Sequence, residues 1–182
     1  MKEKTIQFLA LMVILLLQAC GSDDHNGTDH IIQGNVKGIL LQPLNNGGLT
    51  PAVSETYPKE AFVLAIKLTT DSEAWVGYGR TAVDLPDPIT AIRVYSVNNF
   101  NDSYPAGSDI SSLFKQYPLY INNNLDDTLE RGKHIERIDY LDGFFYKALL
   151  MQPTAGAHQF KVEIQLKSGK LFTAETEELI FV

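Results

Sequence analysis

The chain has 182 residues, with 15 basic and 22 acidic side chains, a formal net charge of −7 and a single cysteine, Cys20. This acidic balance argues against nucleic acid and against an anionic membrane surface as partners, because both are negatively charged. A single cysteine excludes a disulfide within the chain, so the fold depends on an apolar core, for which this length suffices.

Residues 1–19 have the pattern of a secretory signal peptide. Lys2 and Lys4 precede an apolar run, Ile6 to Leu17, which is too short to span a bilayer, since a spanning helix needs about 20 residues. Leu17-Gln18-Ala19-Cys20 resembles the lipobox of bacterial lipoproteins, which implies cleavage before Cys20 and anchoring in a membrane through acyl chains on Cys20. Cleavage leaves 13 basic and 21 acidic residues and a net charge of −8. An ordinary signal peptide with an incidental cysteine is the alternative.

Residues 20–30 then form the acylated cysteine and a small, polar, acidic segment. This composition is typical of a flexible tether. Ser22-Asp23-Asp24 resembles the acidic export signals of surface lipoproteins in the Bacteroidota, which implies an outer membrane lipoprotein of the cell envelope that is exposed at the cell surface. The Asp and His side chains of the tether could also chelate a metal weakly, although a solvated linker explains them as well.

Residues 31–182 are predicted to form a single domain of short strands. Apolar residues alternate along two segments, Phe62 to Leu68 and Phe160 to Leu166, and the strand at 89–97 is apolar on both faces, as a central strand is. Ser168-Gly169 turns the chain into a last strand, Leu171 to Val182. Short strands with turn signals between them predict an all-β fold, an antiparallel β-sandwich of immunoglobulin-like type.

Three local patterns carry further expectations. Pro86-Asp87-Pro88 is expected to break the chain before the strand at 89–97. One short helix is expected near residues 109–117, with Ile110, Leu113, Phe114 and Tyr117 at helical spacing. In the last strand, alternation is expected to place Phe172, Ala174, Thr176, Ile180 and Val182 on one parity, and Glu177-Glu178 is expected to hold a bulge.

The lipobox, the chain length and two blocks, Ala61 to Leu68 and Tyr104 to Ile110, resemble a family of small β-sandwich lipoproteins of the Bacteroidota cell envelope. That family has no assigned function, and the resemblance would cover nearly the whole chain. The two blocks are not catalytic, so the resemblance carries no site residue across.

Catalytic and metal-binding patterns are weak. His134 and His158 are the histidines of the domain; a surface loop explains His134, and a core position beside Phe160 explains His158. The sequence contains no zinc-protease, paired-cysteine, nucleophile-elbow or phosphate-loop motif, so we expect no catalytic residue, no metal site and no cofactor. Oxygen ligands between Asn98 and Asp109 also suit calcium, but the same residues suit turns.

The best candidate for a functional surface is the region 98–124, which combines aromatic and polar side chains. Exposed aromatic rings beside amides and carboxylates suit a glycan or a protein partner. The candidate ligand-binding residues are Asn99, Phe100, Asn101, Asp102, Tyr104, Asp109, Tyr117 and Tyr120. The alternative is that these aromatic side chains fill the open edge of the sandwich.

Asp127-Thr128-Leu129 resembles the short O-glycosylation signal of exported Bacteroidota proteins, so Thr128 is a candidate glycosylation site on a projecting loop. We expect a monomeric, lipid-anchored, non-catalytic binding module at the cell surface, with a glycan, a peptide or another envelope protein as its partner. A structural or adhesin subunit of pilin type is the second hypothesis, and a hydrolase is the third.

Overall fold

The computed structural model describes residues 30–48, 51–72, 81–117, 129, 131–139 and 144–182. Within these ranges the chain forms twelve strands and one short 3-10 helix, η1 (Ser111–Leu113). In the same ranges no helix has the length and the apolar character needed to cross a membrane. The first strand begins at His30, one residue before the expected start of the domain.

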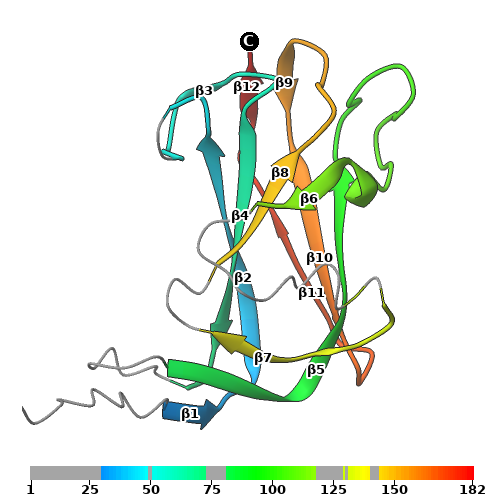
Figure 1. Ribbon diagram of the computed structural model, residues 1–182. Coiled ribbons are helices and arrows are strands. Elements are labelled where there is room, and N and C mark those ends of the chain that lie inside the picture. The colour runs from blue at the N-terminus through cyan, green and yellow to red at the C-terminus, as the bar shows by residue number, and fades with distance from the viewer. Residues whose placement is uncertain (1–29, 49–50, 73–80, 118–128, 130, 140–143) are drawn as a thin grey trace, which may run out of the picture.

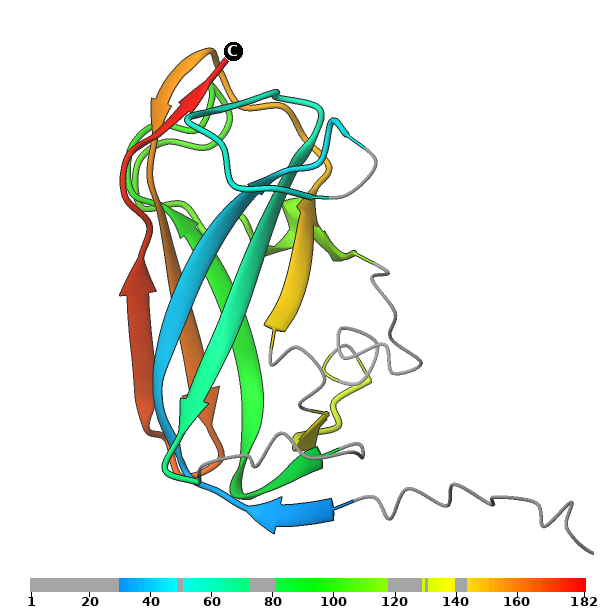
Figure 2. The same ribbon diagram turned by 90° about the vertical axis from the view of Figure 1, so that its left-hand side faces the viewer.

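Two sheets pack face to face as a sandwich (Figures 1 and 2). The β10 sheet has the order β1 (His30–Gln33), β5 (Thr81–Ser96), β10 (Phe160–Leu166) and β11 (Leu171–Glu175), and β7 (Ile135–Asp139) also pairs with β5. The β4 sheet has the order β2 (Val36–Asn45), β4 (Phe62–Thr70), β8 (Phe144–Leu149) and β6 (Phe114–Gln116). A small third sheet, the β12 sheet, contains β3 (Thr56–Tyr57), β12 (Leu179–Phe181) and β9 (Gly156–His158) and lies at one end of the sandwich.

Alternating side chains of the two large sheets form the core. The inward residues of β10 are fully buried or nearly so, and they share one core cluster with the inward residues of β4: Phe160, Val162, Ile164 and Leu166 with Phe62, Leu64, Ile66 and Leu68. The polar residues between those of β10 remain partly exposed on its other face. The predicted all-β sandwich and the predicted core face of β10 are therefore confirmed.

Most strand pairs are antiparallel, as predicted, but two short pairs are parallel. β1 pairs with the beginning of β5, and β12 pairs with β3. These pairs lie at opposite ends of the sandwich (Figure 1). A parallel pair joins segments without a hairpin turn between them, so no local sequence signal predicts it.

Pro86-Asp87-Pro88 lies inside β5 and does not end the strand, which corrects the expected break. The register of β5 with β7 shifts between Asp84 and Ile89, and the pairing of β5 with β10 begins at Ile89. The two prolines occupy this irregular stretch, where the ladder does not require their missing N–H groups. The strand bends sharply near its start (Figure 1).

The helix expected near residues 109–117 is reduced to the single turn η1. Asp109 Oδ1 accepts a hydrogen bond from the Ser111 N–H (2.9 Å), which forms a turn just before η1. Phe114 then adopts an extended backbone (φ −109°, ψ 140°) and pairs with Leu149 of β8. Pairing with β8 thus outweighs the helical spacing of the apolar residues.

A tight corner between β1 and β2 fixes where the chain enters the sandwich. Gly34 is buried, and a Cβ atom there would clash with Ser72 Oγ. Asp71 Oδ1 accepts the Asn35 backbone N–H (2.7 Å), and Asp71 Oδ2 accepts the Asn35 side-chain amide (3.0 Å). The hydrogen bond from the Asn35 backbone is the largest cause that lowers the pKa of Asp71 to about 2.

Candidate functional site

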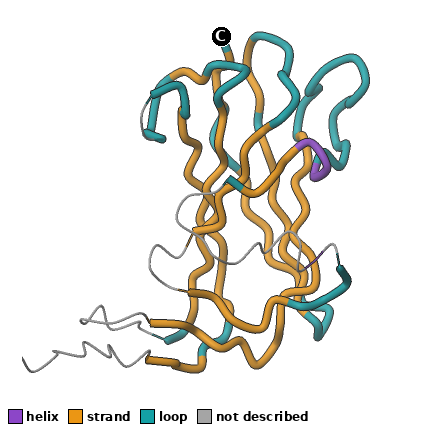
Figure 3. Tube along the Cα trace, viewed as in Figure 1, coloured by secondary structure: helices purple, strands orange, loops and turns teal. Residues whose placement is uncertain are grey.

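The two ends of the sandwich carry different structures, and strands run between them (Figure 3). β1 and the β10–β11 turn lie at one end, which we call proximal because β1 is the first described strand (Figure 1). The β12 sheet lies at the opposite, distal end, together with residues 97–110, which we call the distal loop. Six of the candidate ligand-binding residues belong to the distal loop.

Three of those six use their side chains to hold backbone groups. Asn99 Oδ1 accepts the Ala106 N–H (2.9 Å), and Asn101 Oδ1 accepts the N–H groups of Ser103 (2.9 Å) and Tyr104 (3.1 Å). Asp109 Oδ1 bonds to Ser111, as described above. These oxygens therefore form turns, which is the structural role that Asn and Asp take most often in loops.

Asn98 attaches the distal loop to its neighbouring strand. The Asn98 side-chain amide donates to the Ala157 carbonyl (3.0 Å), and Asn98 Oδ1 accepts the Gln159 N–H (3.1 Å). Gly107, with a left-handed φ of 80°, donates its N–H to the Ser96 carbonyl (2.7 Å) and so joins the far part of the distal loop to the end of β5. The distal loop is therefore fixed to the sandwich along its length and presents its remaining side chains from a defined backbone.

Phe100 does not present an aromatic face to a ligand, which corrects its assignment as a binding residue. Its side chain is 0% exposed and lies within the core cluster. The Phe100 ring contacts the rings of His158 (5.9 Å between centroids) and Phe160 (6.4 Å). Phe100 thus anchors the distal loop to the core. This agrees with the alternative given above, that these aromatic side chains fill the open edge of the sandwich.

The remaining candidate residues differ in their exposure and in their place in the fold. Asp102 is exposed, and Tyr104 is half-buried with its ring edge-on to Phe100 (6.2 Å). Tyr117 lies away from the distal loop, on the outer face of the β4 sheet, where its hydroxyl donates to Asn46 Oδ1 (2.9 Å) and its ring packs on Val63. Tyr120, like Thr128 and Cys20, lies outside the described residues.

A bulge between β11 and β12 changes which residues of the last strand face the core. Lys161 pairs with Glu175, but His158 pairs with Leu179, so the β11–β12 side has one more residue than the β9–β10 side between these two pairs. The predicted bulge at Glu177-Glu178 is therefore confirmed. The extra residue reverses the parity: Leu179 and Phe181 are buried, whereas Ile180 and Val182 are exposed, which corrects their placement with Phe172.

The outward side chains of β12 belong to a larger group of exposed apolar residues. Of the nine large hydrophobic side chains exposed in the described part of the chain, six belong to segments at the distal end: Val53 between β2 and β3, Val97 in the distal loop, Leu150 and Met151 between β8 and β9, and Ile180 and Val182 in and after β12. We call these six residues the distal surface. Sequence reasoning missed it, because Ile180 and Val182 read as core positions; the signal that would have found it was the parity change that a bulge imposes.

His158 lies beneath this end as a core residue, as its parity predicted. The side chain is 1% exposed, and its Nε2 lies 2.8 Å from the Thr154 carbonyl. The other ring nitrogen, Nδ1, has no hydrogen-bond partner among the described residues and is packed near the rings of Phe100 and Phe181. His134, in contrast, is exposed at the beginning of β7. A buried imidazole of this kind contributes to the packing of the core.

The proximal end contains a cleft of about 490 Å³ that the sequence did not indicate. It is lined by Gln33, Asp84, Leu85, Pro86, Pro88, Glu136 and Arg137. Arg137 Nε donates to Asp84 Oδ1 (2.5 Å) and Nη2 to Asp84 Oδ2 (3.3 Å), and this contact lowers the pKa of Asp84. An anionic ligand would have to compete with Asp84 for this guanidinium.

In the described ranges, no three His, Cys, Asp or Glu side chains lie close enough together to hold a metal ion.

The fold and its two ends define a small all-β sandwich domain with a fixed distal loop. The chain belongs to the family described as Domain of unknown function (DUF5034), whose model matches residues 36–177. No curated protein and no solved structure matches the chain. The immunoglobulin-like type therefore stays a prediction within the sandwich class.

Proposed function

We propose that this protein is a lipid-anchored, non-catalytic binding module of the cell envelope that presents its distal surface to a partner. The observation that carries this proposal is the position of the exposed apolar residues, six of which lie at the end opposite β1. Single exposed apolar residues are ordinary on a protein surface, so it is their concentration at one end of the sandwich that supports an interaction site there. The distal loop and the β12 sheet supply the fixed scaffold that such a site needs.

The anchor is supported by the residues that precede the domain. Leu17 to Cys20 match a lipobox, and a tether from Cys20 to Ile31 reaches at most about 36 Å. This tether joins the sandwich at β1, on the proximal end. Acyl chains on Cys20 would therefore hold the proximal end toward the membrane and direct the distal surface away from it.

The location that we propose is the outer face of the outer membrane of a member of the Bacteroidota. The support is Ser22-Asp23-Asp24, which resembles the export signal of surface lipoproteins in that group. Protease treatment of intact cells should then release the domain by cleavage in the tether. Protection equal to that of a periplasmic marker would contradict this location.

Lipid attachment has its own test. Cells that express the wild-type chain should incorporate labelled palmitate into the protein, and cells that express Cys20→Ala should not. Labelling of Cys20→Ala would show that the lipobox interpretation is wrong.

Among the possible partners, we favour an envelope protein over a glycan. The six residues of the distal surface are aliphatic side chains or methionine, which suit the apolar centre of a protein interface. A sugar ring stacks best on an exposed aromatic face, and Phe100 is buried while Tyr104 is half-buried. A pilin-type subunit remains the second hypothesis, and size-exclusion chromatography separates the two, because strand exchange would give a ladder of oligomers.

The binding role is tested by capture from cells with a matched pair of variants. Ile180 and Leu171 are both exposed strand residues, 40% and 53% respectively, but Ile180 is distal and Leu171 is proximal. We expect the purified wild-type chain and Leu171→Ser to capture the same envelope protein, and Ile180→Ser to lose it. Equal capture by both variants would contradict a role for the distal surface.

Thr128 stays a proposed O-glycosylation site, supported by the pattern Asp127-Thr128-Leu129. The intact mass of the protein from its native host should exceed the mass of the mature acylated chain by one glycan, and Thr128→Ala should remove that excess. Masses that differ only by the substitution would contradict the proposal.

A further inference from the structure

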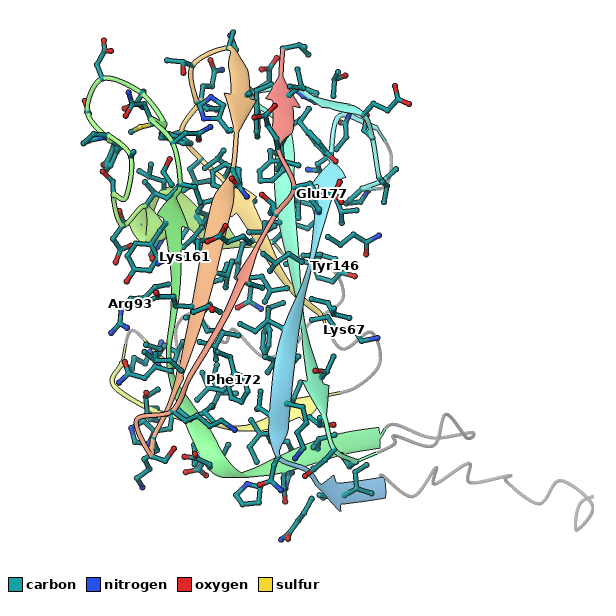
Figure 4. The ribbon with its side chains drawn as sticks, turned by 180° about the vertical axis from the view of Figure 1, so that it is seen from behind. Lys67, Arg93, Tyr146, Lys161, Phe172 and Glu177 are labelled. Atoms are coloured by element: carbon teal, nitrogen blue, oxygen red, sulfur yellow. The ribbon has the colours of Figure 1, made fainter. Side chains whose placement is uncertain are left out.

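Four carboxylates at the distal end have exposed side chains. Glu55, Asp102, Glu177 and Glu178 are exposed, and none of their side chains forms a hydrogen bond or an ion pair among the described residues. Figure 4 shows Glu177 on the segment between β11 and β12, away from the labelled cations. These four carboxylates therefore keep their full capacity to accept hydrogen bonds from a partner.

The acidic residues lie directly beside the apolar ones. Glu177 and Glu178 immediately precede β12, whose Ile180 faces outward. Ile180 pairs with Thr56 of β3 on one side and with Ala157 of β9 on the other, and Glu55 directly precedes Thr56. The outward face of the β12 sheet is thus an isoleucine between two small side chains, with carboxylates at its border.

Few cationic side chains lie near the border carboxylates Glu55, Glu177 and Glu178, and one of these cations is already paired. Lys59, which follows β3, is half-buried. Lys161, on the neighbouring β10, forms an ion pair with Glu163 (2.9 Å) and lies over the ring of Tyr95 (4.7 Å to the centroid). The border of the distal surface therefore has an excess of negative charge in the described part of the chain.

We propose that the occupant of the distal surface is a polypeptide segment that carries lysine or arginine around apolar side chains. This inference rests on the binding role proposed above and names the chemistry of the partner. An apolar segment would cover Ile180 and its neighbours, and cationic side chains beside it would pair with the border carboxylates. An acidic partner of the same shape would meet repulsion, so the border selects against it.

Three synthetic peptides of equal length serve as probes: one of alternating leucine and lysine, one with glutamate in place of lysine, and one with serine in place of leucine. Binding is measured by fluorescence anisotropy with residues 21–182, the mature chain without its acylated cysteine, which contains every described strand. We expect the leucine–lysine peptide to bind tightest and to weaken as sodium chloride rises from 50 to 500 mM, because salt screens exposed charges.

Four variants locate the contact. Ile180→Ser should weaken binding of the leucine–lysine peptide about tenfold, through loss of a buried apolar contact. The double variant Glu177→Gln with Glu178→Gln should weaken it and reduce its salt dependence. Leu171→Ser and Glu136→Gln, an exposed apolar residue and an exposed acidic residue at the proximal end, should leave it unchanged.

The outcomes separate this inference from the function on which it rests. Equal binding of the leucine–glutamate peptide, or equal effects of the distal and proximal variants, would overturn the cationic partner. In that case, loss of cellular capture by Ile180→Ser would still support the distal surface as a binding site. If Ile180→Ser altered neither peptide binding nor cellular capture, the inference and the proposed function would both fail.

Discussion

Three carboxylates at the proximal end of the sandwich and four at its distal end differ in their hydrogen bonding. At the proximal end, Asp71, Asp84 and Asp87 each accept hydrogen bonds that fix a strand junction, from Asn35, Arg137 and Ser168 respectively. All three carboxyl groups have a lowered pKa as a result. At the distal end, Glu55, Asp102, Glu177 and Glu178 have no such partner among the described residues.

The two ends also differ in how many large apolar side chains they expose. The distal end exposes Ile180 and five other large hydrophobic side chains, although Phe100, His158 and Phe181 pack tightly beneath it. The distal end is therefore stabilised by aromatic packing below its surface. The comparison shows that Asp71, Asp84 and Asp87 hold strand junctions together at the proximal end, whereas four exposed carboxylates at the distal end have no partner among the described residues.

The largest expected effect tests whether the distal loop depends on the core. Phe100→Ala should lower the free energy of unfolding by about 3–5 kcal/mol, because it empties a fully buried aromatic site. Asp102→Ala, two residues away and exposed, should change it by less than about 0.5 kcal/mol. Chemical denaturation of both variants is the measurement. A small loss for Phe100→Ala would mean that its ring is free to meet a ligand.

A slightly smaller effect tests the strand that connects the two ends. Ile164→Ala in β10 should cost about 2–5 kcal/mol through lost burial and a cavity. Gln165→Ala, on the outer face of the same strand, should cost well under about 1 kcal/mol. Thermal and urea unfolding should show this difference. Equal losses would mean that both faces of β10 are covered.

The smallest effect tests the proximal carboxylates through pH. The folded state holds the pKa of Asp71 at about 2, below its ordinary value of 3.8, so the folded chain binds fewer protons than the unfolded chain. The stability from this group is present above about pH 4 and is lost as the pH falls toward 2. Asp71→Ala should be less stable at neutral pH and should show a shallower loss across this window. Parallel pH curves for the two proteins would contradict the role of the Asn35 contact.

Alternation in the sequence was a sound guide wherever a strand keeps its register. The residues from Phe160 to Leu166 alternate without interruption, and each inward residue is buried. The same reasoning placed Ile180 and Val182 on the wrong face, although the bulge at Glu177-Glu178 was expected, because one extra residue reverses every later position.

Other features depended on pairings that are not local in sequence. The spacing of Ile110, Leu113 and Phe114 favours a helix, but Phe114 pairs with Leu149, far along the chain. Phe100 lies in a polar loop and reads as exposed, yet the ring of Phe160 covers it. The turns of the distal loop agree with the Asn and Asp residues of its sequence. The distal surface was not predicted, because it depends on a bulge and on the pairing of β3, β12 and β9, which are far apart in the sequence.

Site-specific photo-crosslinking in intact host cells tests whether the distal surface meets a partner at the cell surface. A photoreactive phenylalanine derivative replaces Ile180 in one strain and Leu171 in the other, so that two exposed probes lie at opposite ends of the sandwich. We expect a discrete crosslinked protein from position 180 and none from position 171. Crosslinks of the same pattern and yield from both positions, or from position 171 alone, would contradict it.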